Sequence, residues 1–337
     1  MKILLDEGRP FYKANLHGHT TMSDGAYSPE EVKAHYKRNG YSIIAYTDHE
    51  HLIDNSYLND ENFLAITACE FAIKQFSEQS TLKNMKMKVT HLNLYSLDPH
   101  NTLTPCYSSQ YDHFVNDNCR DLVRFDGQYE RVYSPEGINE MVRIANDQGF
   151  LVSYNHPTWS LENACDYLNY EGFWAVEIYN NSCVMMGIHD DEAVFDDMLR
   201  AGKTIYCTAC DDSHNLHPFG SPNNDSCGGW VCINAERLEY GEVMRALRDG
   251  DFYASTGPEI RHLSIDGNRV TVRTSPCQCI QIVTEGRRTK AVRSEDGGDI
   301  IEATFELLPD DGYFRIRVED GTGKRAYSQA YSVAENY

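Results

Sequence analysis

The amino-acid sequence predicts an α/β fold, a barrel of alternating strands and helices, followed by a small all-β domain. Seven apolar runs have the length of buried strands, and most of them alternate with helical patterns. Polar and acidic residues gather mostly after these runs, as in barrels whose site lies at the C-terminal mouth of the strands. After Pro258 the helical patterns end. We therefore expect the barrel in residues 1–258 and a sandwich-like β domain in residues 259–337.

The first half of the predicted barrel contains one well-marked helix. Ser28, Pro29 and Glu31 form a capping sequence in which serine caps, proline takes the first helical position and glutamate follows three residues after the cap. This helix is expected to end at Gly40. The strands predicted around it are Lys13–His17, Tyr41–Thr47, Phe63–Cys69 and Lys88–Tyr95.

The segment from Ser96 to Tyr133 has no clear period, and it is polar and aromatic. Long insertions between barrel elements are either surface excursions or lids and binding loops, so we assign no site residues to it. Beyond it, helices are predicted from Ser134 to Gly149 and over Asp190–Arg200. The remaining predicted strands are Phe150–Asn155, Phe173–Tyr179 and Thr204–Cys210.

The last part of the predicted barrel is a closing strand, Trp230–Asn234, and a helix, Tyr240–Asp249. Residues 259–337 then show short alternating runs separated by turn sequences such as Asp266-Gly267-Asn268 and Asp310-Asp311-Gly312. Such spacing is typical of a small β-sandwich. The single histidine of this part is His262, and no metal-like cluster is evident there.

The composition of the chain excludes some classes of binding partner. The formal charge is −21, from 30 Lys and Arg against 51 Asp and Glu, so long nucleic acid is not expected to bind. The N-terminus lacks the apolar core of a signal peptide, and no run is long enough to span a membrane. We expect a cytoplasmic protein without a membrane partner. Its 11 cysteines are scattered and odd in number, which favours reduced thiols over a disulfide framework.

One stretch carries the strongest chemical signal. His17 and His19 are separated by one residue, so in an extended chain both imidazoles face the same way and can share one ion. Asp24 follows five residues after His19, and Asp48-His49 follows the next apolar run. Imidazole and carboxylate ligands suit zinc, iron or manganese, and the absence of thiolates argues against a structural zinc site.

Further motifs in order along the chain complete the pattern. They are Thr47-Asp48-His49, Glu70, His91, Asn155-His156-Pro157 and Asp212-Ser213-His214. Together with His17-x-His19 and Asp24 they resemble the PHP (polymerase and histidinol phosphatase) superfamily of metal-dependent phosphoesterases, over roughly residues 10–257. The sequence Tyr253–Pro258 before a small β domain is similar to a two-domain PHP subgroup that includes carbamate hydrolases. The resemblance implies a distorted, TIM-like (β/α)7 barrel.

The resemblance also implies two to three divalent ions of zinc, manganese or iron. His17, His19, Glu70 and Asp212 would bind the first ion. Glu70 would bridge to a second ion held by His91 and His156, and the third would be bound by Asp24, His49 and His214. Glu70, Asp212 and His214 are also expected to serve in catalysis.

Two assignments stay open. The D-x-H spacing of the resemblance selects Asp212 as the ligand, and Asp211 either supports the site or is structural. Asp48 is expected to orient or cap rather than bind. The proton donor to the leaving group is not assigned; His51, Asp211, His189 and His217 lie near motif loops, although a surface or hydrogen-bonding role suits each of them better.

The chemistry of such a site predicts hydrolysis. Two cations bridged by a carboxylate lower the pKa of a shared water, and the resulting hydroxide is the expected nucleophile. The preferred substrate is a small phosphate ester, such as a nucleotide, a sugar phosphate or an amino-alcohol phosphate. The alternative is metal-assisted hydrolysis of a carbamate or carboxylic ester, and a non-catalytic metal-containing binding protein is a third possibility. Exonuclease action on short oligonucleotides also stays open.

Overall fold

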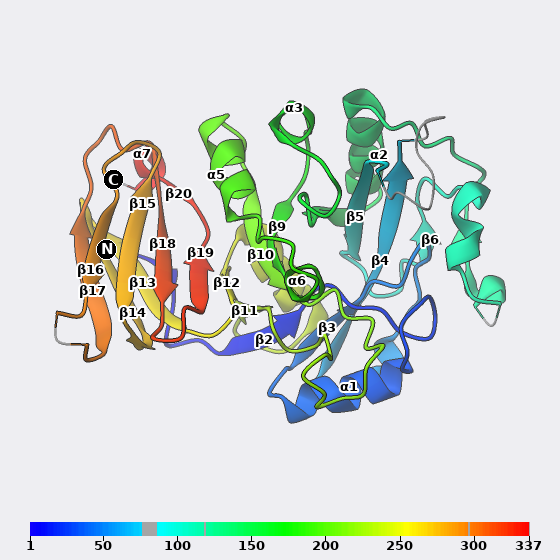
Figure 1. The fold of residues 1–337 in the computed structure, drawn as a ribbon, viewed down its shortest axis with the longest axis horizontal. Helices are drawn as coiled ribbons and strands as arrows, with labels where there is room; N and C mark the ends of the chain where they lie inside the picture. The colour runs from blue at the N-terminus through cyan, green and yellow to red at the C-terminus, as the bar shows by residue number, and fades with distance from the viewer. Residues whose placement is uncertain (76–85, 118, 296, 337) are drawn as a thin grey trace.

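The computed structural model describes residues 1–75, 86–117, 119–295 and 297–336, and its centre is one long mixed sheet (Figure 1). Each of the seven predicted runs overlaps a strand, and these strands are neighbours in the sheet. In spatial order they are β10 (Tyr206–Cys210), β9 (Ala175–Asn180), β8 (Phe150–Asn155), β5 (Val89–Ser96), β4 (Leu64–Lys74), β3 (Ile43–Tyr46) and β2 (Phe11–Asn15). The α/β class predicted from the sequence is therefore confirmed.

The predicted (β/α)7 barrel is not confirmed, because the sheet is not closed and its strands are not all parallel. β5 runs antiparallel to both β4 and β8, whereas the other neighbouring pairs from β10 to β2 are parallel. The chain segments after β2 and β10 still meet, since Asp212 donates its backbone N–H to the carbonyl of His17 at 2.9 Å. The His19 N–H likewise bonds to the Ser213 carbonyl at 2.8 Å.

The helices begin where the capping residues predict. α1 (Pro29–Arg38) has the full capping box between Ser28 and Glu31, and α2 (Pro135–Asp147) begins after the N-cap Ser134. α5 (Glu192–Arg200) and α6 (Tyr240–Asp249) fill the other two predicted helices. Shorter helices are α3 (Ala164–Tyr167), α4 (Asn181–Met185), α7 (Val333–Asn336) and the 3-10 turns η1 (Ser56–Leu58), η2 (Ser109–Phe114) and η3 (Arg120–Leu122).

The sheet continues from β2 through β11 (Trp230–Asn234) and β12 (Phe252–Ser255) into strands of the C-terminal part. These are β19 (Arg325–Ser328), β18 (Tyr313–Glu319), β15 (Cys279–Thr284) and β16 (Lys290–Arg293), with β20 (Tyr331–Ser332) paired to β18. A second sheet contains β1 (Lys2–Leu5), β13 (Ile260–Asp266), β14 (Arg269–Cys277) and β17 (Ile300–Glu306). One apolar cluster includes residues of both sheets, and both chain ends lie in this region (Figure 1).

The C-terminal part differs from the prediction in two ways. It contains the short helix α7, and it recruits β1 from the N-terminus, which pairs with β13. The division of the chain at residue 258 itself stays a prediction.

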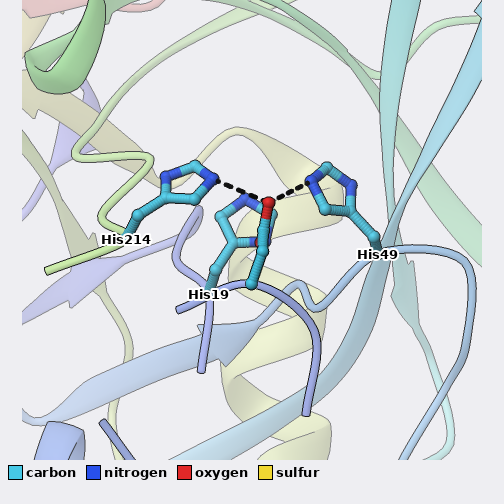
Figure 2. A group of neighbouring side chains, drawn as sticks. His19, His49 and His214 are labelled. Carbon is cyan, nitrogen blue, oxygen red and sulfur yellow. Dashed lines mark ion pairs between the residues drawn. The ribbon is translucent and has the colours of Figure 1, made fainter. Parts of the chain in front are cut away.

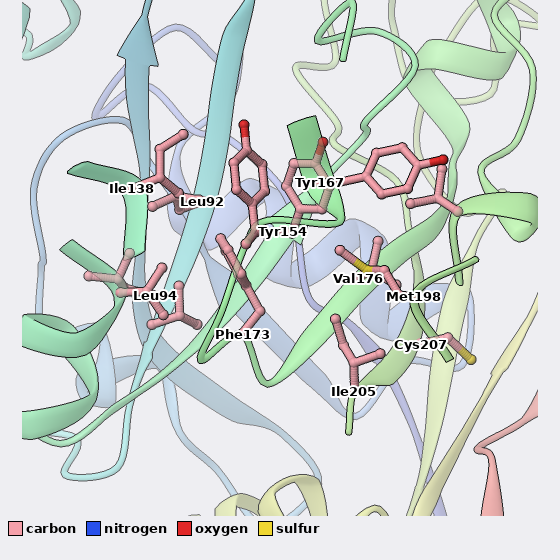
Figure 3. Close-up of a cluster of buried hydrophobic side chains, with 14 of the residues drawn as sticks. Leu92, Leu94, Ile138, Tyr154, Tyr167, Phe173, Val176, Met198, Ile205 and Cys207 are labelled. Atoms are coloured by element: carbon pink, nitrogen blue, oxygen red, sulfur yellow. The ribbon is translucent and has the colours of Figure 1, made fainter. Parts of the chain in front are cut away.

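The largest apolar core lies where α2 packs on β8 and α5 packs on β9. Figure 3 shows side chains of this core, with Leu92 and Leu94 from β5, Tyr154 from β8 and Val176 from β9. Strands covered on both faces consist mainly of apolar residues. The polar side chains that remain buried within or directly after these strands are therefore exceptions that call for a chemical explanation.

Candidate metal centre

The structure brings all nine predicted ligands into three adjoining groups. One group contains His17, His19, Glu70 and Asp212; a second contains Glu70, His91 and His156; the third contains His19, Asp24, His49 and His214. Within each group one nitrogen or carboxylate oxygen per residue lies within 4.8 Å of the others. The sets match those implied by the resemblance, with the addition of His19 to the third. Whether they bind metal remains a prediction.

The ends of neighbouring strands position these side chains. His17 and His19 follow β2, His49 follows β3, and His156 follows β8. Asp212 and His214 follow β10, whereas Asp24 lies in the turn that begins after His19.

Two ligands lie inside strands instead. Glu70 lies in the middle of β4, which continues to Lys74, and not at its end as predicted. His91 lies near the start of β5, because this strand runs antiparallel to β4 and so begins at the edge of the sheet where the parallel strands end.

The first group is the most deeply buried. His17 Nε2 lies 3.2 Å from Glu70 Oε1 and 3.2 Å from Asp212 Oδ1, and His19 Nε2 lies 3.1 Å from the same Asp212 oxygen. Burial raises the pKa of Glu70, but the charges of His91 and His17 outweigh it and hold this pKa well below its usual value. The carboxylate is therefore ionised and needs positive charge beside it.

Glu70 also joins the second group to the first. Its Oε1 lies 3.0 Å from His91 Nδ1 and 3.4 Å from His156 Nε2. Asn155 donates its side-chain N–H to the same oxygen at 2.9 Å, which fixes the carboxylate between the histidines. A carboxylate held in this way suits a bridge between two ions.

The third group faces solvent. The Asp24 side chain is 43% exposed, and its Oδ2 lies 3.5 Å from both His49 Nε2 and His214 Nε2. Figure 2 shows His49 and His214 on opposite sides of these ion pairs, with His19 between them. The centre is therefore buried at the first group and exposed to solvent at the third.

The hydrogen bonding of the ring nitrogens fits a metal site. In the described part of the chain, His17 Nε2, His19 Nδ1 and His49 Nδ1 are buried and have no hydrogen-bond partner. Buried polar atoms nearly always have partners, so unpaired imidazole nitrogens beside carboxylates fit a set of metal ligands. The ion pairs of Glu70, Asp24 and Asp212 in the described residues are with histidines, and none is with lysine or arginine.

A further residue, Glu177, supports the centre and was missed by the sequence analysis. It is buried in β9, and its carboxylate accepts hydrogen bonds from His17 Nδ1 at 2.8 Å, the His156 N–H at 3.1 Å and Asn180 Nδ2 at 3.0 Å. A carboxylate only accepts, so His17 must carry its proton on Nδ1, which leaves the Nε2 lone pair for an ion. Glu177 lies within the apolar run FWAVEIY, whose one acidic residue is the only signal in the sequence.

The two undecided aspartates have distinct environments. Asp211 accepts hydrogen bonds from Tyr36 Oη and from the N–H groups of Cys227, Gly228 and Gly229, outside the three groups. Asp48 accepts from the backbone and hydroxyl groups of Thr20 and Ser23, and so shapes the turn that holds Asp24. Both act on the architecture around the ligands.

Of the proton-donor candidates, none belongs to the three groups. His51 is buried and its Nδ1 contacts the His49 carbonyl at 2.6 Å, whereas His189 and His217 are exposed.

Backbone strain occurs at two of the predicted ligands. His156 has φ of +30° and Asp212 has φ of +51°, conformations that residues other than glycine adopt rarely. Such strain is found most often at functional sites, where the surrounding structure compensates for it.

The segment between Ser96 and Tyr133 lies against the centre. The Phe114 ring packs on the His49 ring at a centroid distance of 4.8 Å, and Asn116 Nδ2 donates to the Thr21 carbonyl at 3.0 Å. At its far end, Arg131 pairs with the buried Glu50 at 2.6 Å. Phe114 and Asn116 of this segment therefore contact the predicted site, which agrees with the binding-loop alternative that its sequence left open.

No protein-family model matches the chain, and no curated protein matches it. Among solved structures, it is similar to a two-domain protein from Bacteroides vulgatus containing a predicted PHP-like metal-dependent phosphoesterase, at 13% identity and a TM-score of 0.45, over 98% of each chain.

Two further solved structures cover less of the chain. A candidate metal-dependent phosphoesterase from Bifidobacterium adolescentis has 15% identity and a TM-score of 0.36, over 64% of this chain and 93% of that one. An amidohydrolase from Chromobacterium violaceum, with bound sulfate and no metal, has 15% identity and a TM-score of 0.36, over 60% and 87%.

Proposed function

We propose that this protein is a metal-dependent hydrolase that cleaves a phosphate ester of a small molecule, such as a nucleotide, a sugar phosphate or an amino-alcohol phosphate. The observation that carries the proposal is the sharing of ligands between the three groups. Glu70 belongs to two of them and His19 to two. Shared ligands are what adjoining ions need, so we propose that two to three zinc, manganese or iron ions bind here.

The ions would supply an activated water at neutral pH and positive charge that stabilises the phosphoryl oxygens in the transition state. The chain's own residues prepare the site. Glu177 fixes the tautomer of His17, and the Asp212 carbonyl accepts from His214 Nδ1 at 3.0 Å, which leaves His214 Nε2 for the third group.

We propose catalytic roles for Glu70, Asp212 and His214, which their positions support. Glu70 and Asp212 hold negative charge at fixed points in the buried group, while His214 lies at the open edge, where its side chain is 25% exposed. A substrate phosphate enters from this edge, since the other groups are closed to solvent.

We further propose that residues 1–258 form the catalytic part, as an incomplete and distorted barrel, and that residues 259–337 form a separate β domain. All nine ligands lie in residues 1–258, and none of the three groups includes a described residue of the β part. We place the protein in the cytoplasm. None of the helices in the described ranges has the length and apolar character needed to cross a bilayer.

A substrate panel tests the proposed reaction. Protein stripped with a chelator and reloaded with manganese, zinc or iron is offered phosphomonoesters, phosphodiesters and aryl carbamates. Release of phosphate or of the alcohol, lost in His17→Ala and Glu70→Ala, is the expected result. Carbamate turnover without cleavage of any phosphate ester would replace the proposal by its alternative. Activity unchanged by either substitution would contradict a role for the metal groups.

A further inference from the structure

Lys74 lies on the same face of β4 as Glu70, because the pairing of β4 with β5 is regular. The register runs without a shift from Ala68 to Lys74, so alternate residues face one side of the strand. Glu70, Ala72 and Lys74 therefore share a face. At about 3.3 Å per residue, the Lys74 backbone lies roughly 13 Å beyond that of Glu70.

Aromatic rings connect the Lys74 ammonium to the ligands. Its Nζ lies 4.7 Å from the centre of the Phe114 ring and 5.4 Å from that of Tyr111, within the range of cation–π attraction. Phe114 in turn packs on His49. The ammonium is thus one ring away from a predicted ligand.

A further aromatic side chain, Trp159, contacts histidines of the second group. Trp159 packs 5.2 Å from the His91 ring and 4.8 Å from the His156 ring. Trp159 and Phe114 both pack against the small cluster formed by Ala72, Val89 and Tyr111. Lys74 is therefore connected to the predicted ligands through aromatic side chains that pack on them.

Lys74 has no anionic partner among the described residues, since no ion pair or hydrogen bond of its ammonium is found there. The nearby Glu50 is already paired with Arg131. Burial lowers the pKa of Lys74, and the charge of Glu50 offsets this only in part. By contrast Lys33, Lys37 and Lys88 all pair with aspartates.

We infer that Lys74 determines specificity by binding a second negatively charged group of the substrate, on the part of the ester that is not attacked. The inference rests on the proposed function and narrows its substrate class to phosphate esters that carry a further carboxylate or phosphate. A half-buried cation without a counter-ion among the described residues, in a chain of charge −21, is suited to an anion that arrives with the ligand.

Two substrates of equal shape test this. 4-Carboxyphenyl phosphate and 4-carbamoylphenyl phosphate differ by one charge, and kcat/KM is measured for both with the metal-loaded full chain. Lys74→Gln is expected to lower kcat/KM for the carboxylate by roughly 10- to 100-fold and to change the amide by less than about 3-fold. Lys74→Arg should restore most of the loss. Lys290→Gln, which removes an exposed lysine on β16, is the matched control.

Equal losses on both substrates, or no loss on either, would overturn the inference. Thermal unfolding of each variant separates loss of fold from loss of recognition. Wild-type protein that hydrolyses neither of these esters nor any phosphate ester of the panel would refute the proposed function instead. In that case the Kd values of the corresponding carboxy- and carbamoyl-phenylphosphonates, measured by calorimetry, still decide the role of Lys74, because only the carboxylate should bind more weakly to Lys74→Gln.

Discussion

Glu177 provides a sharp test of how the centre is held together, because it touches a predicted ligand without belonging to the three groups. Its substitution by glutamine keeps the shape and removes the charge. Glutamine also presents an NH₂ group on one side, so it cannot accept from His17 Nδ1, the His156 N–H and Asn180 Nδ2 in the way the carboxylate does.

The expected size of the effect follows from these contacts. A hydrogen bond to a charged group contributes about 1.5–3 kcal/mol, which corresponds to a 10- to 150-fold change in an equilibrium constant. Loss of a partner behind a ligating histidine usually lowers metal affinity about 10- to 100-fold. We therefore expect Glu177→Gln to bind zinc or manganese 10- to 100-fold more weakly than wild type.

The assay is competition for the metal with a chelating dye, at fixed pH and with folding checked by circular dichroism. Glu162→Gln is the matched control, because Glu162 is also a buried glutamate but accepts from the hydroxyls of Thr90, Tyr133, Tyr154 and Tyr170. Its metal affinity should stay within about 3-fold of wild type. Unchanged affinity in a folded Glu177→Gln protein, or equal losses in both variants, would refute the reasoning.

Three further predictions concern the surroundings of the site. Arg131→Met leaves Glu50 buried and unpaired and should cost about 3–5 kcal/mol in urea unfolding; a cost below 1 kcal/mol would contradict the pairing. Gly25→Ala places a Cβ against the backbone carbonyl of His19, so the turn that holds Asp24 must shift, and we expect both weaker metal binding and lower stability in urea unfolding; unchanged metal affinity in dye competition would contradict this. Burial raises the pKa of Asp191 to about 7 in the folded, metal-free protein. As pH rises from the pKa of an unfolded aspartate toward 7, the folded state therefore loses stability relative to the unfolded state. Asp191→Asn removes this titration, so the unfolding free energy of the variant minus that of wild type should rise by about 2–3 kcal/mol from pH 5 to pH 8, measured by urea unfolding. A difference that is the same at both pH values would exclude this cause.

Local sequence signals predicted the elements well. The capping residues Ser28 and Ser134 locate two helix starts because a cap is satisfied within one turn of chain. The apolar runs locate the strands for the same reason, since their period depends on neighbouring residues alone. The nine predicted ligand residues come from ordered motifs, and the structure brings them together.

What the sequence could not supply depends on long-range geometry. The residues of β5 do not indicate its direction, since a buried strand has the same apolar pattern in either orientation. Because β5 runs antiparallel to β4, His91 lies near the start of its strand and still reaches the other predicted ligands. Glu177 contacts His17 across 160 residues of chain, and the packing of Phe114 on His49 joins an irregular segment to the site. Neither contact leaves a periodic signal.

The most direct test of the central claim is phosphate release by chelator-treated protein as metal is added back. The account predicts no hydrolysis of phosphomonoesters without metal, and activity that rises to a plateau at two to three equivalents of manganese, zinc or iron per chain. Hydrolysis that persists in the metal-free protein, or metal bound at that stoichiometry with every phosphate ester left intact, would contradict it.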